Sequence, residues 1–228
     1  MAGDNYFLLT ALPALGELGT PPPLTARQLL ELLDDAPARA LAQVVLLSDD
    51  LLEAMAAQAG EVSDAQPVVL TREQALGQAP LPDYLSPGAD SSPDRPGRLT
   101  SDAMWDRYYR WGLEVARRRG SGLLDLWLRT ELALRNTLAA ARAAALGLDG
   151  SAYLVAPQLA SEVEDVSAAV AAWSAAPDPL SALRALDQWR WNWLRRHDGW
   201  FSFGDDEIAA YAAKLLLLIR WDRLDRSM

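Results

Sequence analysis

The densest group of side chains that could do chemistry is the string DDLLE at residues 49–53. Two adjacent carboxylates, with a third one helical turn later, can hold Mg²⁺ for chemistry on diphosphates. Isoprenoid synthases pair such a motif with a second acidic motif containing Asn and Ser, and none of the three asparagines here lies in one. One hypothesis is therefore a Mg²⁺-dependent enzyme using Asp49, Asp50 and Glu53. The other is that Ser48 caps a helix whose first-turn acids complement the helix dipole.

Aromatic and cationic side chains alternate in WRWNWLRR, residues 189–196. Such alternation can grip single-stranded nucleic acid. On a helix, however, Trp189 and Trp193 share a face while Trp191 points elsewhere, so no continuous stacking platform forms. A net charge of −10 also opposes phosphate binding. We predict a packed helix and no nucleic-acid partner. Because Trp is enriched in protein interfaces, these three residues are candidates for structural or interface contacts.

Three polar residues, Glu131, Arg135 and Asn136, interrupt an otherwise apolar helical pattern over 123–146. Glu131 and Arg135 are one turn apart and can pair. Either the group is a buried polar clasp or partner contact, or it is an exposed ion pair of small energetic effect. His197 follows a helix end and has no nucleophile or acid arranged around it, so we predict a structural role.

Composition excludes several kinds of site. The 228 residues contain no cysteine and one histidine, which excludes thiol nucleophiles, disulfides and zinc sites built from thiolates or several histidines. Glycine-rich phosphate loops are absent. The sequence thus predicts no catalytic residues, no cofactor and no metal. No apolar run approaches the roughly 20 residues of a membrane span. Asp4 stands where a signal peptide would be basic, so we expect a cytoplasmic protein.

Prolines and charge organise the chain. Residues 77–102 are rich in Pro, Gly and Ser and predict an exposed connection. It separates an acidic helical segment, 1–76, from a helical segment, 103–228, and we expect these two to pack as one unit. Residues 1–100 carry 5 Arg and 14 acids, a net charge of −9, which suits a basic partner.

Spacing of apolar residues, caps and prolines predicts an all-α, multi-helix fold. Short extended segments are possible at 43–47 and 67–71. The expected helices, with their starting residues where a cap is assigned, are 26–35 after Thr25, 49–59 after Ser48, 103–119 after Ser101 or Asp102, 123–146, 157–173, 181–196 from Ser181, and 205–224 with a capping box of Ser202 and Asp205.

The string LLDLWLRTELALRNTLAAARAAALGLD, residues 123–149, resembles a helix of the C subunit of V-type and A-type ATPases, which is named d in eukaryotes. NYFLLTALPALG at 5–16 resembles the start of a shorter, uncharacterised bacterial branch of that family. Residues 186–221 are similar to the closing helices of the same branch.

The resemblance implies a non-catalytic collar of helical lobes. In this family the protein sits on the cytoplasmic side of the proteolipid ring, receives the foot of the central stalk and transmits torque during ion transport. Its partners would be other rotary ATPase subunits, and it would be peripheral to the inner (plasma) membrane only through the complex. Glu131, Arg135 and Asn136 match polar positions of the family and would be structural. Longer members have three lobes, and 228 residues suffice for about two. The alternative is a stand-alone helical interaction adaptor.

Overall fold

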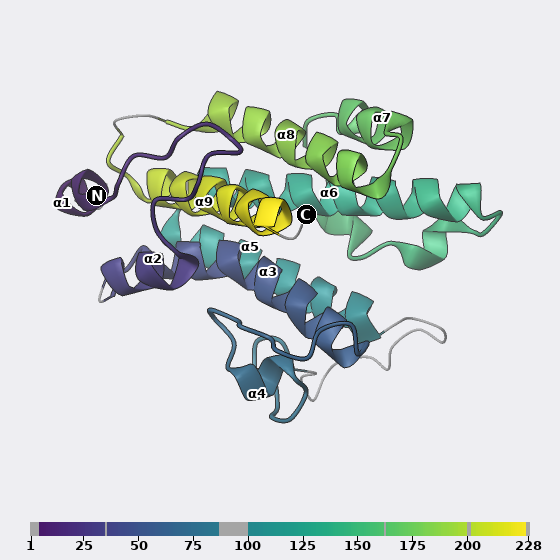
Figure 1. The fold of residues 1–228 in the computed structure, drawn as a ribbon, viewed down its shortest axis with the longest axis horizontal. Coiled ribbons are helices and arrows are strands. Elements are labelled where there is room, and N and C mark those ends of the chain that lie inside the picture. Colours follow the sequence, from purple (N-terminus) through teal and green to yellow (C-terminus); the bar gives the residue numbers. More distant parts are fainter. Residues whose placement is uncertain (1–4, 35, 87–99, 162, 200–201, 227–228) are drawn as a thin grey trace. The chain divides into compact units, whose positions relative to one another are not determined.

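The computed structural model describes residues 5–34, 36–86, 100–161, 163–199 and 202–226. Regular structure in these ranges is entirely helical, which confirms the predicted all-α class. The helices are α1 (Tyr6–Ala11), α2 (Ala26–Leu32), α3 (Arg39–Gln58), α4 (Arg72–Ala75), α5 (Thr100–Arg119), α6 (Gly122–Ala145), the 3₁₀ turns η1 (Gly150–Tyr153) and η2 (Pro157–Leu159), α7 (Ser167–Ala175), α8 (Pro179–His197) and α9 (Asp205–Arg226) (Figure 1).

Two compact units divide the chain. Unit 1 comprises residues 1–79, 115–124 and 187–228, and unit 2 comprises 80–114 and 125–186. Unit 1 therefore takes residues from both sides of the expected connection at 77–102, whereas unit 2 begins inside that connection and takes residues only from it and from the segment after it. Residues 87–99 of that connection lie outside the described ranges.

Helix α9 forms the core of unit 1. It packs against α3 and α2, and Figure 1 shows it beside α3. Between Ile208 and Ile219 every residue of α9 except Tyr211 is buried. A helix buried on nearly all sides shows no apolar stripe, because it has no polar face to alternate with. Each fully buried leucine here, such as Leu215, contributes on the order of 1.5–3 kcal/mol.

Unit 2 is built on α6 and the aromatic part of α5. Leu128, Leu132 and Leu134 of α6 are fully buried. On α5, Trp105 meets Tyr108 edge to face, with ring centroids 5.4 Å apart. Such edge contacts suit the ring quadrupoles and add to the area that the rings bury.

Helix α3 differs from prediction at its start. It begins at Arg39, so Ser48 lies in mid-helix and donates its hydroxyl to the main-chain oxygen of Val45. The predicted cap at Ser48 is wrong, and so is the extended segment at 43–47. Leu41, Val44 and Leu47 are fully buried, and this packing outweighs the β-preference of the valines.

The second possible extended segment, 67–71, is neither helix nor strand. The main-chain N–H groups of residues 68–70 bind a side chain of α3 instead of a neighbouring strand.

The predicted helix over 157–173 is wrong. The chain there forms η2, an irregular stretch and the shorter α7. Ala156, directly before the predicted start, has a left-handed φ of 36° and is followed by the 3₁₀ turn. Asp165 accepts the main-chain N–H of Ser167 at 2.8 Å and so fixes the later start of α7.

Of the other predicted caps, Thr25 is confirmed, and those of α5, α8 and α9 are wrong. Helix α5 begins at Thr100, so Ser101 and Asp102, the two predicted caps, lie inside the helix. Thr25 accepts from the N–H of Gln28 in a capping box, as expected for a cap at that residue. Helix α8 begins two residues before Ser181, at Pro179. The box predicted for Ser202 and Asp205 is wrong: Glu207 accepts from the main-chain N–H of Ser202.

Within the described ranges, no helix combines the length and the apolar character needed to cross a bilayer.

Candidate functional site

The three carboxylates of the DDLLE string bind separate partners. Asp49 accepts from Arg220 at 3.0 Å and from Arg223 at 2.8 Å, both on α9. Glu53 accepts from the main-chain N–H of Gln66 at 2.9 Å. Across the described residues, no group of three or more acidic, histidine or cysteine side chains is arranged to hold a metal ion.

Asp50, the middle carboxylate, is buried and accepts hydrogen bonds from the loop at residues 68–70. Its carboxylate accepts the main-chain N–H groups of Val68, Val69 and Leu70 at 2.9, 2.6 and 2.8 Å. Burial raises the pKa of this carboxyl, and the three donors only partly offset that effect. The Asp50 side chain thus replaces a ladder of backbone hydrogen bonds and holds residues 68–70 against α3.

Asp49 is ionised in the same region. Burial acts to raise its pKa, but Arg220 and Arg223 outweigh burial, and the pKa lies below its ordinary value. The result is a charged tie between α3 and α9.

The predicted polar group on α6 is structural in its contacts. Arg135 approaches Asp102 at 3.3 Å and lies over the Trp105 ring, 4.8 Å from its centroid. Asn136 is buried, donates to the main-chain oxygen of Val155 at 2.8 Å and accepts its N–H at 2.9 Å. Glu131, one turn before Arg135, is half-buried. The sequence left open a buried polar clasp or partner contact on one side and an exposed ion pair on the other. The contacts of Asn136 are those of a buried clasp.

The three tryptophans of α8 lie in different surroundings. Trp193 is fully buried and stacks on His197, with ring centroids 4.0 Å apart. Trp191 is 4 % exposed and Trp189 is half-buried. The Nδ1 atom of His197 lies 2.9 Å from the main-chain oxygen of Trp193. These rings serve packing within unit 1 and form no shared stacking surface.

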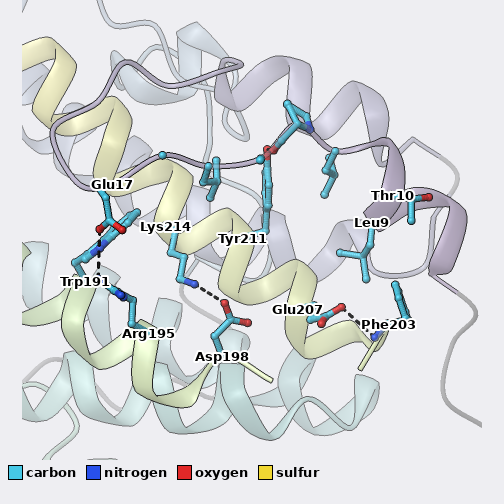
Figure 2. Close-up of a pocket in the computed structure, with 15 residues that line it drawn as sticks. Leu9, Thr10, Glu17, Trp191, Arg195, Asp198, Phe203, Glu207, Tyr211 and Lys214 are labelled. Carbon is cyan, nitrogen blue, oxygen red and sulfur yellow. Dashed lines mark hydrogen bonds and ion pairs between the residues drawn. The ribbon is translucent and has the colours of Figure 1, made fainter. Parts of the chain in front are cut away.

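A pocket of about 530 Å³ lies in unit 1 between the segment 9–17 and the helices α8 and α9. Its size falls within the ~300–1,000 Å³ typical of small-molecule sites. The lining residues are Leu9, Thr10, Leu12, Pro13, Ala14, Leu15, Gly16, Glu17, Trp191, Arg195, Asp198, Phe203, Glu207, Tyr211 and Lys214 (Figure 2).

Two polar side chains of α9 hold the pocket's framework. Lys214 forms a buried ion pair with Asp198, which follows the end of α8. Tyr211 donates its hydroxyl to the main-chain oxygen of Pro13 at 2.8 Å, which ties segment 9–17 to α9. Burial raises the pKa of Tyr211 to about 12, so the phenol remains a donor at physiological pH.

Phe203 stands at the pocket wall in an unusual backbone conformation. Its φ is +51°, a left-handed value that is rare for a bulky side chain. The carboxylate of Glu207 holds it there by accepting the Phe203 N–H at 3.0 Å. Strain of this kind costs on the order of 1–3 kcal/mol and occurs most often at functional sites.

Sequence reasoning missed this pocket. Lys214 offered a signal, since it is the single lysine of the chain and interrupts an apolar run between Ala213 and Leu215. Segment 9–17 offered none, because its packing against α8 and α9 joins residues about 200 positions apart.

Comparisons of the chain with protein-family models, with curated proteins and with solved structures gave no match.

Proposed function

We propose that this chain is a non-catalytic collar subunit of a V/A-type rotary ATPase, linking the central stalk to the proteolipid ring for torque transmission. It would join the cytoplasmic face of the membrane through the complex. The proposal begins with the sequence resemblance of residues 5–16, 123–149 and 186–221 to the C subunit of those ATPases. Those ranges hold α1 and most of α6, α8 and α9.

The observation that carries the proposal is the set of charged ties along α9. Near its start, Asp205 accepts from Arg119 at 3.0 Å. In its middle, Lys214 pairs with Asp198, and near its end Arg220 pairs with Asp49. A part that transmits torque must resist sliding of its helices. Ties at three levels of one helix resist sliding, because breaking any of them leaves a half-buried charge without its partner.

The contacts of the acidic string favour this function over the Mg²⁺-dependent enzyme. The carboxylates of Asp49 and Asp50 are engaged by α9 and by the 68–70 loop. A metal ion would have to displace two arginines and three main-chain donors. The stand-alone adaptor has the same structural requirements as the collar, so only its partners separate the two.

The test is an affinity purification of the tagged chain from its own cells after gentle detergent extraction, with the co-purifying proteins identified by mass spectrometry. The proposal expects head, stalk and proteolipid subunits in fixed ratio, and none of them from untagged cells. Recovery of the chain without them, from cells shown to assemble a rotary ATPase, would leave the adaptor as the better explanation.

A second arm tests how the chain reaches the membrane. We expect it in the membrane fraction of normal cells and in the soluble fraction of cells that lack the proteolipid ring. Membrane association that persists without the ring would contradict attachment through the complex.

A further inference from the structure

The pocket in unit 1 differs between its two ends. Figure 2 shows Glu17, Trp191 and Arg195 gathered at one end, and Leu9, Thr10, Phe203 and Glu207 at the other. At the second end the polar groups are engaged within the chain: the Thr10 hydroxyl donates to the main-chain oxygen of Tyr6, and Glu207 accepts the N–H of Phe203. The surface left to a ligand there is mainly apolar. Such a division matches an amphipathic ligand better than a wholly apolar or wholly polar one.

At the polar end, the guanidinium of Arg195 is held by a weak partner. It pairs with Glu17 at 3.3 Å, and the two side chains are 58 % and 75 % exposed. Ion pairs this exposed contribute little to stability, so another carboxylate can replace Glu17 at small cost. The Glu17 carboxylate in effect occupies the position of an anionic ligand group.

A second donor lies one helical turn away. The indole Nε1 of Trp191 is buried and has no hydrogen-bond acceptor among the described residues. Residues 191 and 195 are four apart on α8, so they project from the same face. A buried N–H without an acceptor is costly, and a ligand oxygen would relieve that cost.

The other charges of the pocket are already engaged. Lys214 pairs with Asp198, and Glu207 accepts the N–H groups of residues 202 and 203. Toward the far end, Leu9 and Phe203 supply apolar surface (Figure 2). The strained backbone of Phe203 keeps its ring at that wall before any ligand arrives.

We propose that this pocket binds a small amphipathic monocarboxylate. Its carboxylate replaces Glu17 at Arg195 and accepts the Trp191 N–H, and its apolar body lies along Leu9 and Phe203. Binding of such a ligand does not depend on the chain being part of a rotary ATPase.

The test compares decanoate with 1-decanol, both below micelle-forming concentrations, by equilibrium dialysis against the purified full chain. Decanoate is expected to bind at least about tenfold more tightly, since only it makes charge-assisted hydrogen bonds. Equal binding of the two, or no binding of decanoate, would overturn the proposal.

Variants locate the site. Arg195→Gln should lose at least about tenfold in decanoate affinity, and Glu17→Gln should bind decanoate more tightly than the parent, because the competing carboxylate is gone. Arg226→Gln, an exposed arginine near the end of α9 outside the pocket lining, is the matched control. All three lie at exposed side chains, and unchanged thermal unfolding will show that they fold. An Arg195→Gln variant that binds like the parent would place the ligand elsewhere and refute the proposal.

Discussion

At the scale of single residues, amide and carboxylate side chains take the place of regular backbone pairing. Asn136 makes two hydrogen bonds to the main chain of Val155, and Asp50 satisfies three consecutive N–H groups. Buried main-chain groups need partners, and in both places a single side chain from a helix supplies them to an irregular segment. Such residues fix loops that have no strand or helix of their own.

Replacing Asn136 tests this role. Asn136→Ala should lower the free energy of unfolding by about 1–3 kcal/mol, because it leaves the N–H and oxygen of Val155 buried without partners. Thr137→Ala is the matched control: its exposed hydroxyl donates to the oxygen of Ala133 within α6, and it should change stability by less than about 0.5 kcal/mol. Urea denaturation measures both, and equal effects would show that the clasp is unimportant.

The tie at Asp49 should appear in the pH dependence of stability. Its folded pKa lies below the unfolded value of about 3.9, so the ionised tie stabilises the fold above that pH and is lost as pH falls through the folded pKa. Asp49→Asn should be less stable than the parent by about 1–3 kcal/mol near neutrality, with the gap closing in acid. In Asp34→Asn, whose carboxylate is 73 % exposed, the corresponding gap should be near zero. A gap for Asp49→Asn that stays constant into acid would contradict the assigned tie.

At the scale of helices and turns, the junction of α5 and α6 depends on one glycine. Gly120 has a φ of +67°, whereas Gly122 has an ordinary φ, and a Cβ would meet open space at either position. Gly120→Ala should therefore cost about 1–2 kcal/mol through backbone strain alone. Gly122→Ala, at the start of α6, should be neutral or slightly stabilising. Thermal unfolding of the two variants separates the effect of the positive φ from the effect of adding a Cβ. Equal destabilisation of both variants would contradict the prediction.

Helix ends that are marked by glycines or by first-turn acids could be predicted from the sequence. Helix ends that depend on packing against distant residues could not. Gly120 and Gly147 mark the ends of α5 and α6, and the acids at 205–207 mark the start of α9. The start of α3 depends on burial against α9, which lies about 170 residues away. Val155 is held by two hydrogen bonds to Asn136, 19 residues earlier in the chain. The local sequence pattern carries no trace of either contact.

The same reason limited prediction of the candidate site. Residues 131, 135 and 136 stood out because they are polar in an apolar helix. Arg135 pairs with Asp102, and Asn136 binds the main chain of Val155. The pocket joins residues 9–17 to residues 191–214. The donors Arg195 and Trp191 meet segment 9–17 only in the folded chain, so the sequence alone does not mark them as a binding site.

At the scale of the whole molecule, the charge is large and uneven. Of the net charge of −10, residues 1–100 carry −9. In the proposed assembly this favours a basic partner through long-range attraction.

Salt should therefore weaken the assembly. Raising NaCl from about 0.1 M to about 1 M shortens the screening length from ~10 Å to ~3 Å, and the recovery of partner proteins in the affinity purification should fall. Sucrose at matched viscosity serves as the control and should leave recovery unchanged. Recovery that is indifferent to salt would assign the contact to apolar surface instead.

The burial of Lys214 has a practical consequence for mapping these contacts. It is the single lysine among 21 cationic residues, and its side chain is only 9 % exposed in its ion pair. Cross-linking reagents that couple lysine amines will therefore find almost nothing to react with on this chain, however many partners surround it. The 31 carboxylates, which are spread along the whole chain, can be coupled instead. Acid-directed cross-linking will therefore reveal the neighbours of this chain.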